Sequence, residues 1–293
     1  MNSLTTESTD VPYGYHDFAV LRAEGAHYVD KTGCLPELFR LKFQTLLITR
    51  PRRFGKSLFL SMLRNFLEYN YLDDPGFEQR LDRRFAGLEI SEEKYRDFCA
   101  DHRARYAVIM LSFSGIKEHS FSDCLKRFAS LMYGLYKEYE FLLERPELTD
   151  DDRENFAQCL KLNKQKYFDD SQLSSLILDA VPQLAQLLRR VYGRKVMVLI
   201  DEYDVPLQNA YTLNSQDILS GTPGALALDL PQSFYQQMAR FIRLLFEPIV
   251  KPPATGRTAP DETASAIYRT IMTGCLRVSK ESIFTGANNL TVS

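Results

Sequence analysis

The segment TLLITRPRRFGKSLFLSMLRNFLEY, residues 45–69, decides how this chain folds. Residues 45–49 are apolar or branched and too few to form an independent helix, so they predict a buried strand. From residue 56 onward apolar side chains recur at three- and four-residue spacing, which predicts a helix over residues 56–70. The eight residues RPRRFGKS lie directly between the two. A strand, a tight turn and a helix start together favour phosphate binding, because backbone N–H groups and the helix's partial positive charge converge there.

Three residues of this turn have the chemistry of a phosphate-binding loop. Gly55 lets the backbone approach an anion closely, the Lys56 ammonium reaches the outer phosphates, and the Ser57 hydroxyl is a hard oxygen donor for a phosphate-bound magnesium ion. The pattern departs from G-x-x-x-x-G-K-[ST], because Arg50 occupies the first glycine position and Pro51 fixes the next φ. A basic turn that happens to contain Gly-Lys-Ser is therefore the competing interpretation.

The arginines inside the turn have two interpretations of their own. Arg52 and Arg53 add positive charge where a triphosphate would lie, but salt bridges to acidic neighbours explain them equally well. The full set of predicted nucleotide-binding residues is Arg52, Arg53, Phe54, Gly55, Lys56, Ser57 and Leu58.

A second block, VMVLIDEYD at residues 196–204, supports the first. It is an apolar run that ends in two consecutive carboxylates, as a magnesium-binding strand end does in phosphate-loop ATPases. Asp201 is expected to hold the metal opposite Ser57, and Glu202 to orient and deprotonate the attacking water. The alternative is a solvated strand end with a helix-capping carboxylate, and we favour that alternative for Asp204 alone.

A further apolar run, IYRTIMTG, ends in a polar tip at Thr273. When such a strand lies between the loop strand and the acidic strand, its tip can hydrogen-bond the γ-phosphate or the attacking water. Thr273 is therefore a catalytic candidate together with Lys56 and Glu202. Arg277 could contact phosphate or another subunit, although a lone arginine after a strand is more often a surface residue.

The remaining periodicity predicts an α/β fold. Strands are expected at residues 45–49, 107–113, 196–200 and 270–273, and helices at residues 56–70, 121–143, 173–192 and 233–246. The strands show no polar alternation, so we expect a mainly parallel sheet with helices on both faces, the three-layer sandwich of P-loop NTPases. We treat residues 1–293 as one domain with its core at 11–293, and residues 144–170 and 211–265 as insertions or loops. Residues 144–170 look like a solvated excursion and residues 251–263 like a mobile loop.

Composition excludes several classes of protein. Thirty-six Lys and Arg against 38 Asp and Glu give a net charge of −2, which argues against binding nucleic acid or an anionic membrane by bulk charge. No apolar run approaches the roughly 20 residues needed to cross a bilayer, and no secretory signal is visible, so a cytoplasmic location is expected. Five scattered cysteines indicate reduced thiols. The basic residues at 189, 190, 194 and 195 are expected to offset a helix dipole rather than bind nucleic acid.

Four blocks in order resemble a known family. RPRRFGKSL, LIDEYD, the upstream YVDKTGCLPEL at residues 28–38 and the terminal TGCLRVSKESIFTGANNL at residues 273–290 are similar to the AAA-ATPase-like family of bacterial and archaeal proteins, which is related to the signal-transduction (STAND) ATPases. The similarity begins near Val11. An arginine at the first glycine position is typical of that family.

The resemblance implies ATP and Mg2+ as ligands, and a sheet in which the strand at 270–273 lies between those at 45–49 and 196–200. It also implies that residues 28–32 pack near the adenine. Family members commonly continue into a helical lid and a PD-(D/E)XK nuclease domain; both are expected to be missing here, and we assign no nuclease chemistry.

The sequence therefore predicts an ATP-binding protein with slow Mg2+-dependent hydrolysis that acts as a conformational switch on an unknown protein partner or effector domain. The alternatives are a nucleotide-gated interaction module without significant turnover, and a truncated inactive relative. A homo-oligomer is compatible with the sequence, and direct nucleic-acid binding by this domain is not expected.

Overall fold

The computed structural model describes residues 14–219, 233–250, 266–275 and 290–292. The chain forms two compact units. The first unit comprises residues 1–42 and 53–106, and the second comprises residues 43–52 and 107–293. The predicted loop at 251–263 and Arg277 lie outside the described residues.

The second unit contains a parallel sheet. Its strands are β1 (Thr45–Thr49), β2 (Ala107–Ser112), β3 (Val196–Asp201), β4 (Ile267–Gly274) and β5 (Leu290–Val292). They are ordered β2-β3-β4-β1-β5, and every pairing is parallel. The prediction that β4 lies between β1 and β3 is confirmed. All six residues of β3 are buried, which explains why its sequence is apolar without alternation.

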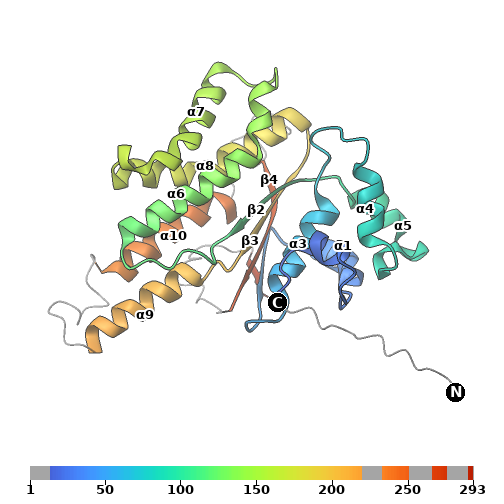
Figure 1. The fold of residues 1–293 in the computed structure, drawn as a ribbon, viewed down its shortest axis with the longest axis horizontal. Helices are drawn as coiled ribbons and strands as arrows, with labels where there is room; N and C mark the ends of the chain where they lie inside the picture. Colours follow the sequence, from blue (N-terminus) through green and yellow to red (C-terminus); the bar gives the residue numbers. More distant parts are fainter. Residues whose placement is uncertain (1–13, 220–232, 251–265, 276–289, 293) are drawn as a thin grey trace. The chain divides into compact units, whose positions relative to one another are not determined.

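Several helices of the second unit contact this sheet, and others pack on those helices. They are α6 (Phe121–Glu138), α7 (Asp150–Leu160), α8 (Asp170–Tyr192), α9 (Val205–Leu219) and α10 (Phe234–Val250), with the 3-10 helices η4 (Glu140–Glu144) and η5 (Lys161–Tyr167). Figure 1 shows α6, α8 and α10 side by side, and α8 contacts β2, β3 and β4. The predicted α/β class with a parallel sheet is confirmed.

Residues 144–170 differ from the solvated excursion expected from their acidity. They contain α7, whose first turn is stabilised by a capping box between Thr149 and Asp152. Phe156 is buried, with its ring centroid 4.6 Å from that of Tyr136 in α6. Three consecutive aspartates are an unfavourable helix interior but a favourable first turn, because they lie at the positive end of the helix dipole.

Residues 211–265, expected as an insertion or loop, are also partly helical. Their first nine residues belong to α9, and α10 extends four residues past the predicted end at 246. The apolar face of α10, including Phe241 and Leu245, is buried in the second unit.

The first unit is helical. It contains α1 (Phe18–Ala23), η1 (Thr32–Cys34), α2 (Leu35–Arg40), α3 (Lys56–Leu67), α4 (Phe77–Phe85), η2 (Glu89–Ser91), η3 (Glu93–Tyr95) and α5 (Arg96–His102). Its core is aromatic: the Phe85 ring centroid lies 5.1 Å from that of Phe18 and 5.5 Å from that of Phe66. This core fixes α3, whose amino-terminal end carries the turn predicted to bind phosphate.

Candidate functional site

The turn between β1 and α3, residues 50–57, is called the phosphate loop below. Arg53 and Gly55 both have positive φ, 67° and 73°. Gly55 is the residue before α3, and its carbonyl accepts the hydrogen bond from Phe59 N–H at 2.9 Å. A side chain at Gly55 would be strained in this left-handed conformation. The bend places the helix start at Lys56, as the sequence predicted.

The side chains of the phosphate loop differ in how far they are exposed. Arg52 and Arg53 are exposed, as is Phe54 at 60%, whereas Lys56 is only 8% exposed. Ser57 and Leu58 are half-buried. The first turn of α3 contains no acidic residue, so its helix dipole is not offset from within the helix. The loop therefore has the local charge of an anion site.

A residue that our sequence reasoning did not assign to the loop lies against it within the first unit. The Lys31 ammonium donates a 3.4 Å hydrogen bond to the Phe54 carbonyl, and it would lie 3.2 Å from a Cβ placed on Gly55. Lys31 lies within residues 28–32, which the family resemblance places near the adenine, and that placement stays a prediction. The neighbouring Tyr28 packs its ring on Phe18, with centroids 5.2 Å apart, and burial raises its pKa to about 12.

Asp30 and Thr32 fix the backbone on either side of Lys31. Asp30 Oδ1 accepts hydrogen bonds from Thr32 N–H at 2.8 Å and Thr32 Oγ1 at 2.7 Å, and its Oδ2 accepts from Glu89 N–H at 2.6 Å. Burial acts to raise the pKa of the Asp30 carboxyl, but the hydrogen bonds from Glu89 and Thr32 outweigh it and leave that pKa below its usual value.

The carboxyl ends of β3 and β4 form a second polar group, within the second unit. We call it the acidic edge: Asp201, Glu202, Asp204, Thr273 and Gly274. Asp201 Oδ1 accepts hydrogen bonds from Thr273 Oγ1 at 2.5 Å and from Glu202 N–H at 3.0 Å. The structure thus brings together Asp201 and Thr273, and the Thr273 hydroxyl points at the carboxylate.

Glu202 follows directly, in an unusual conformation. Its φ is 50°, a left-handed value that few non-glycine residues adopt, and its side chain is half-buried. The next residue, Tyr203, donates its N–H to the Thr273 carbonyl at 3.2 Å, which ties the end of β3 to the end of β4. Glu202 therefore lies outside β3, whose six residues are all buried.

Asp204 precedes α9, and its carbonyl accepts a 2.9 Å hydrogen bond from Gln208 N–H, as expected of a residue at a helix start, but it is not solvated. It is 1% exposed, and its Oδ2 accepts hydrogen bonds from Cys275 N–H at 2.9 Å and from Gln208 Nε2. Gly274 is packed against it: a Cβ there would lie 2.5 Å from Tyr203 Cε1 and 2.7 Å from Asp204 Oδ1. The sequence could not show the contact with Cys275, because that residue directly follows β4 and lies 71 residues further along the chain.

The donors present suit magnesium better than a closed protein metal centre. Among the described residues there is no group of three or more His, Cys, Asp or Glu that could hold a metal ion. One carboxylate and one hydroxyl, at Asp201 and Ser57, are hard oxygen donors, and magnesium in phosphate-binding proteins typically uses one or two such groups plus phosphate oxygens. That the two oppose each other across one metal ion stays a prediction.

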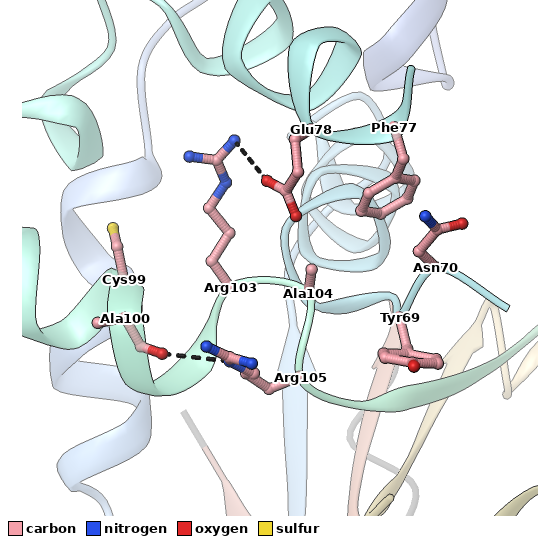
Figure 2. Close-up of a pocket in the computed structure, with 9 residues that line it drawn as sticks. All are labelled: Tyr69, Asn70, Phe77, Glu78, Cys99, Ala100, Arg103, Ala104 and Arg105. Carbon is pink, nitrogen blue, oxygen red and sulfur yellow. Dashed lines mark hydrogen bonds and ion pairs between the residues drawn. The ribbon is translucent and has the colours of Figure 1, made fainter. Parts of the chain in front are cut away.

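A separate hollow of about 330 Å³ lies in the first unit, lined by nine residues (Figure 2). Its arginines are engaged by protein groups: Arg103 lies 2.5 Å from Asp82 and 3.8 Å from Glu78, and Arg105 Nε donates to the Ala100 carbonyl at 3.2 Å. No phosphate-loop residue lines it. We therefore assign this hollow no part in the predicted site.

None of the helices in the described part of the chain combines the length and the apolar character that crossing a bilayer requires.

Comparison with known proteins identifies the class. Residues 12–284 match the family described as "Predicted AAA-ATPase", so the chain belongs to that family and the resemblance is confirmed. Membership of this family suggests an ATP-binding, nucleotide-dependent function. A curated relative, "Uncharacterized protein in vnfD 5'region" of Azotobacter chroococcum mcd 1, is 25% identical over 286 residues, which cover 96% of this chain and 40% of that protein. The chain thus spans less than half the length of this relative. No solved structure was found to match the chain.

Proposed function

We propose that this protein binds ATP with Mg2+ through residues of its phosphate loop and of its acidic edge, and hydrolyses it slowly. The observation that carries the proposal is the bend at Gly55, which starts α3 at Lys56 directly after a strand inside a parallel sheet. Helix amino termini at the carboxyl ends of parallel strands bind phosphate in many nucleotide-binding folds.

The phosphate groups would be held by the phosphate loop. Lys56 and the backbone N–H groups of residues 55–58 are proposed to bind the triphosphate, with Arg52 and Arg53 adding positive charge. The absence of an acidic residue from the first turn of α3 supports this assignment, because a carboxylate there would compete with phosphate for the same amides.

Metal and water would be handled at the acidic edge. When bound, Mg2+ neutralises charge that develops on the outer phosphates. Ser57 and Asp201 are proposed to hold it, and the hydrogen bond from Thr273 to Asp201 Oδ1 orients that carboxylate. Glu202, half-buried and turned out of the strand, is proposed to accept a proton from the attacking water.

Binding and turnover of Mg·ATP by the purified protein test the proposal. Wild type should bind, Lys56→Ala should lose most of its affinity, and Glu202→Gln should bind ATP but turn it over at least tenfold more slowly. Lys42→Ala, at an exposed lysine of the first unit, is the matched control and should behave as wild type. Wild type and Lys56→Ala binding equally well would contradict the proposal.

A second candidate is a nucleotide-gated interaction module without significant turnover. It is favoured by one observation: the Thr273 hydroxyl is committed to Asp201. Identical slow turnover in wild type and Glu202→Gln, with Mg·ATP binding intact in both, would support this module. In either case the proposed output is a conformational switch acting on a protein partner or effector domain.

A further inference from the structure

Lys31 lies beside the phosphate loop and contacts Phe54 and Gly55, the two residues that precede α3. Its Nζ is 3.4 Å from the Phe54 carbonyl oxygen and 3.2 Å from where a Cβ on Gly55 would be. Its side chain is exposed. The ammonium therefore lies next to the peptide that joins Phe54 to Gly55, one residue before α3 begins.

The backbone of Lys31 is held on both sides by long-range hydrogen bonds. Asp30 accepts from Glu89 N–H, 59 residues away, and Thr32 Oγ1 accepts from Ile90 N–H at 3.1 Å, 58 residues away. Asp30 also accepts both the N–H and the hydroxyl of Thr32, which closes a tight turn around Lys31. The side chains of Asp30 and Thr32 thus bind backbone N–H groups of η2, and the side chain of Lys31 contacts the phosphate loop.

Such an arrangement lowers the entropic cost of binding. The Cα of Lys31 is already positioned, so only side-chain torsions need to be ordered when the ammonium meets a ligand. Its partner here is a neutral carbonyl at a long hydrogen-bonding distance. A phosphate oxygen would be a better acceptor, because hydrogen bonds between two ionised groups are shorter and roughly twice as strong.

We propose that Lys31 is a second phosphate-binding cation of the nucleotide site, acting with Lys56 on the outer phosphates of a nucleoside triphosphate. This inference rests on the function proposed above. Lys31 would exchange the Phe54 carbonyl for a phosphate oxygen, and its charge would favour ATP over ADP. In this proposal Lys31 of the YVDKT segment binds the outer phosphates, and the hydrogen bonds of Asp30 and Thr32 hold the backbone of Lys31 in place.

The test is the affinity of purified protein for Mg·ATP and Mg·ADP, measured by calorimetry. Lys31→Met keeps the length and apolar stem of the side chain without its charge. We expect it to weaken ATP binding about tenfold and ADP binding less, because a charge-assisted hydrogen bond to the outer phosphate is lost. Lys31→Arg should retain most of the affinity, and Lys42→Met, also exposed in the first unit, should change neither.

Thermal unfolding of the same variants separates ligand binding from a structural role. If Lys31 acts only by its hydrogen bond to the Phe54 carbonyl, Lys31→Met will lower the unfolding temperature and will weaken the binding of ATP and of ADP equally. That result would overturn the proposal. Unchanged ATP affinity in Lys31→Met, with Lys56→Ala defective, overturns it while leaving the proposed function intact. Absence of ATP binding by wild type overturns both.

Discussion

The phosphate loop and the acidic edge use their polar groups in opposite ways. In the loop Arg52, Arg53 and Phe54 are exposed, and Lys31 reaches it from an exposed side chain. At the acidic edge the polar groups are interior: Asp201, Asp204 and Thr273 are 4%, 1% and 0% exposed. Both regions carry predicted ligand-binding residues, and at the acidic edge a hydrogen bond between neighbouring strands joins Thr273 to Asp201.

This difference in burial predicts different effects of substitutions in the two regions. Replacing an exposed cation on a loop changes the free energy of unfolding little, so substitutions there should act mainly on ligand affinity. Buried carboxylates are held by hydrogen bonds whose loss leaves unsatisfied groups in the interior, so substitutions there should act first on stability. The predictions below test this contrast, beginning with the largest expected effect.

Gly274→Ala should be the most damaging single-methyl change. The new Cβ would lie 2.5 Å from the Tyr203 ring and 2.7 Å from Asp204 Oδ1, so β4 must shift at its carboxyl end. We expect a loss of about 2 kcal/mol in the free energy of unfolding, as for other overpacked cores. Gly134→Ala in α6 is the control: its Cβ meets no atom within 4 Å, and it should stabilise by about 0.5–1 kcal/mol. Equal denaturation midpoints for the two variants would contradict the close packing seen at Gly274.

Asp204→Ala should also destabilise the second unit, by about 1–3 kcal/mol, because Cys275 N–H and Gln208 lose their buried acceptor. Asp204→Asn keeps an acceptor oxygen and should recover most of that loss. Hydrogen exchange at the Cys275 amide is the direct measurement, with fast exchange expected in the alanine variant only. Equal exchange rates in wild type and Asp204→Ala would show that the bond does not fix the end of β4.

Arg52→Ala should lower Mg·ATP affinity and leave stability nearly unchanged, the opposite of the effect expected for Asp204→Ala. The side chain is exposed, so the free energy of unfolding should stay within about 0.5 kcal/mol of wild type. Mg·ATP affinity should fall several-fold, and the fall should shrink as salt is added, because exposed charges are screened. A stability loss as large as that of Asp204→Ala would erase the proposed contrast between loop and edge.

The smallest effect concerns pH. The pKa of Asp30 is lowered in the folded protein, so its charged form contributes stability above the pKa of the unfolded chain, near 3.9 by the ordinary aspartate value. That contribution is lost as the pH falls through the lower folded pKa. The thermal unfolding temperature of wild type should therefore drop more steeply below about pH 4 than that of Asp30→Asn. Parallel curves for the two proteins would contradict the role assigned to Asp30.

Sequence reasoning went furthest where local pattern and chemistry coincide. The strand at 45–49 and the helix start at Lys56 were predictable, because a branched apolar run, a glycine and a helical period are all local signals. It failed at residues 144–170, where charge suggested solvent while a capping box and a buried Phe156 make a helix. It also misread Asp204, since a run of carboxylates looks alike whether solvated or buried.

By itself the sequence determined the parallel α/β class, the order of β1, β4 and β3 through its family resemblance, and the residue types of the predicted site. Only the tertiary structure decided which hydrogen-bond partners those residues have. Thr273 donates to Asp201, Cys275 donates to Asp204, and Lys31 donates to the Phe54 carbonyl of the phosphate loop. The physical reason is that hydrogen bonds form between atoms brought together by packing of distant segments, and a spacing along the chain does not encode that proximity.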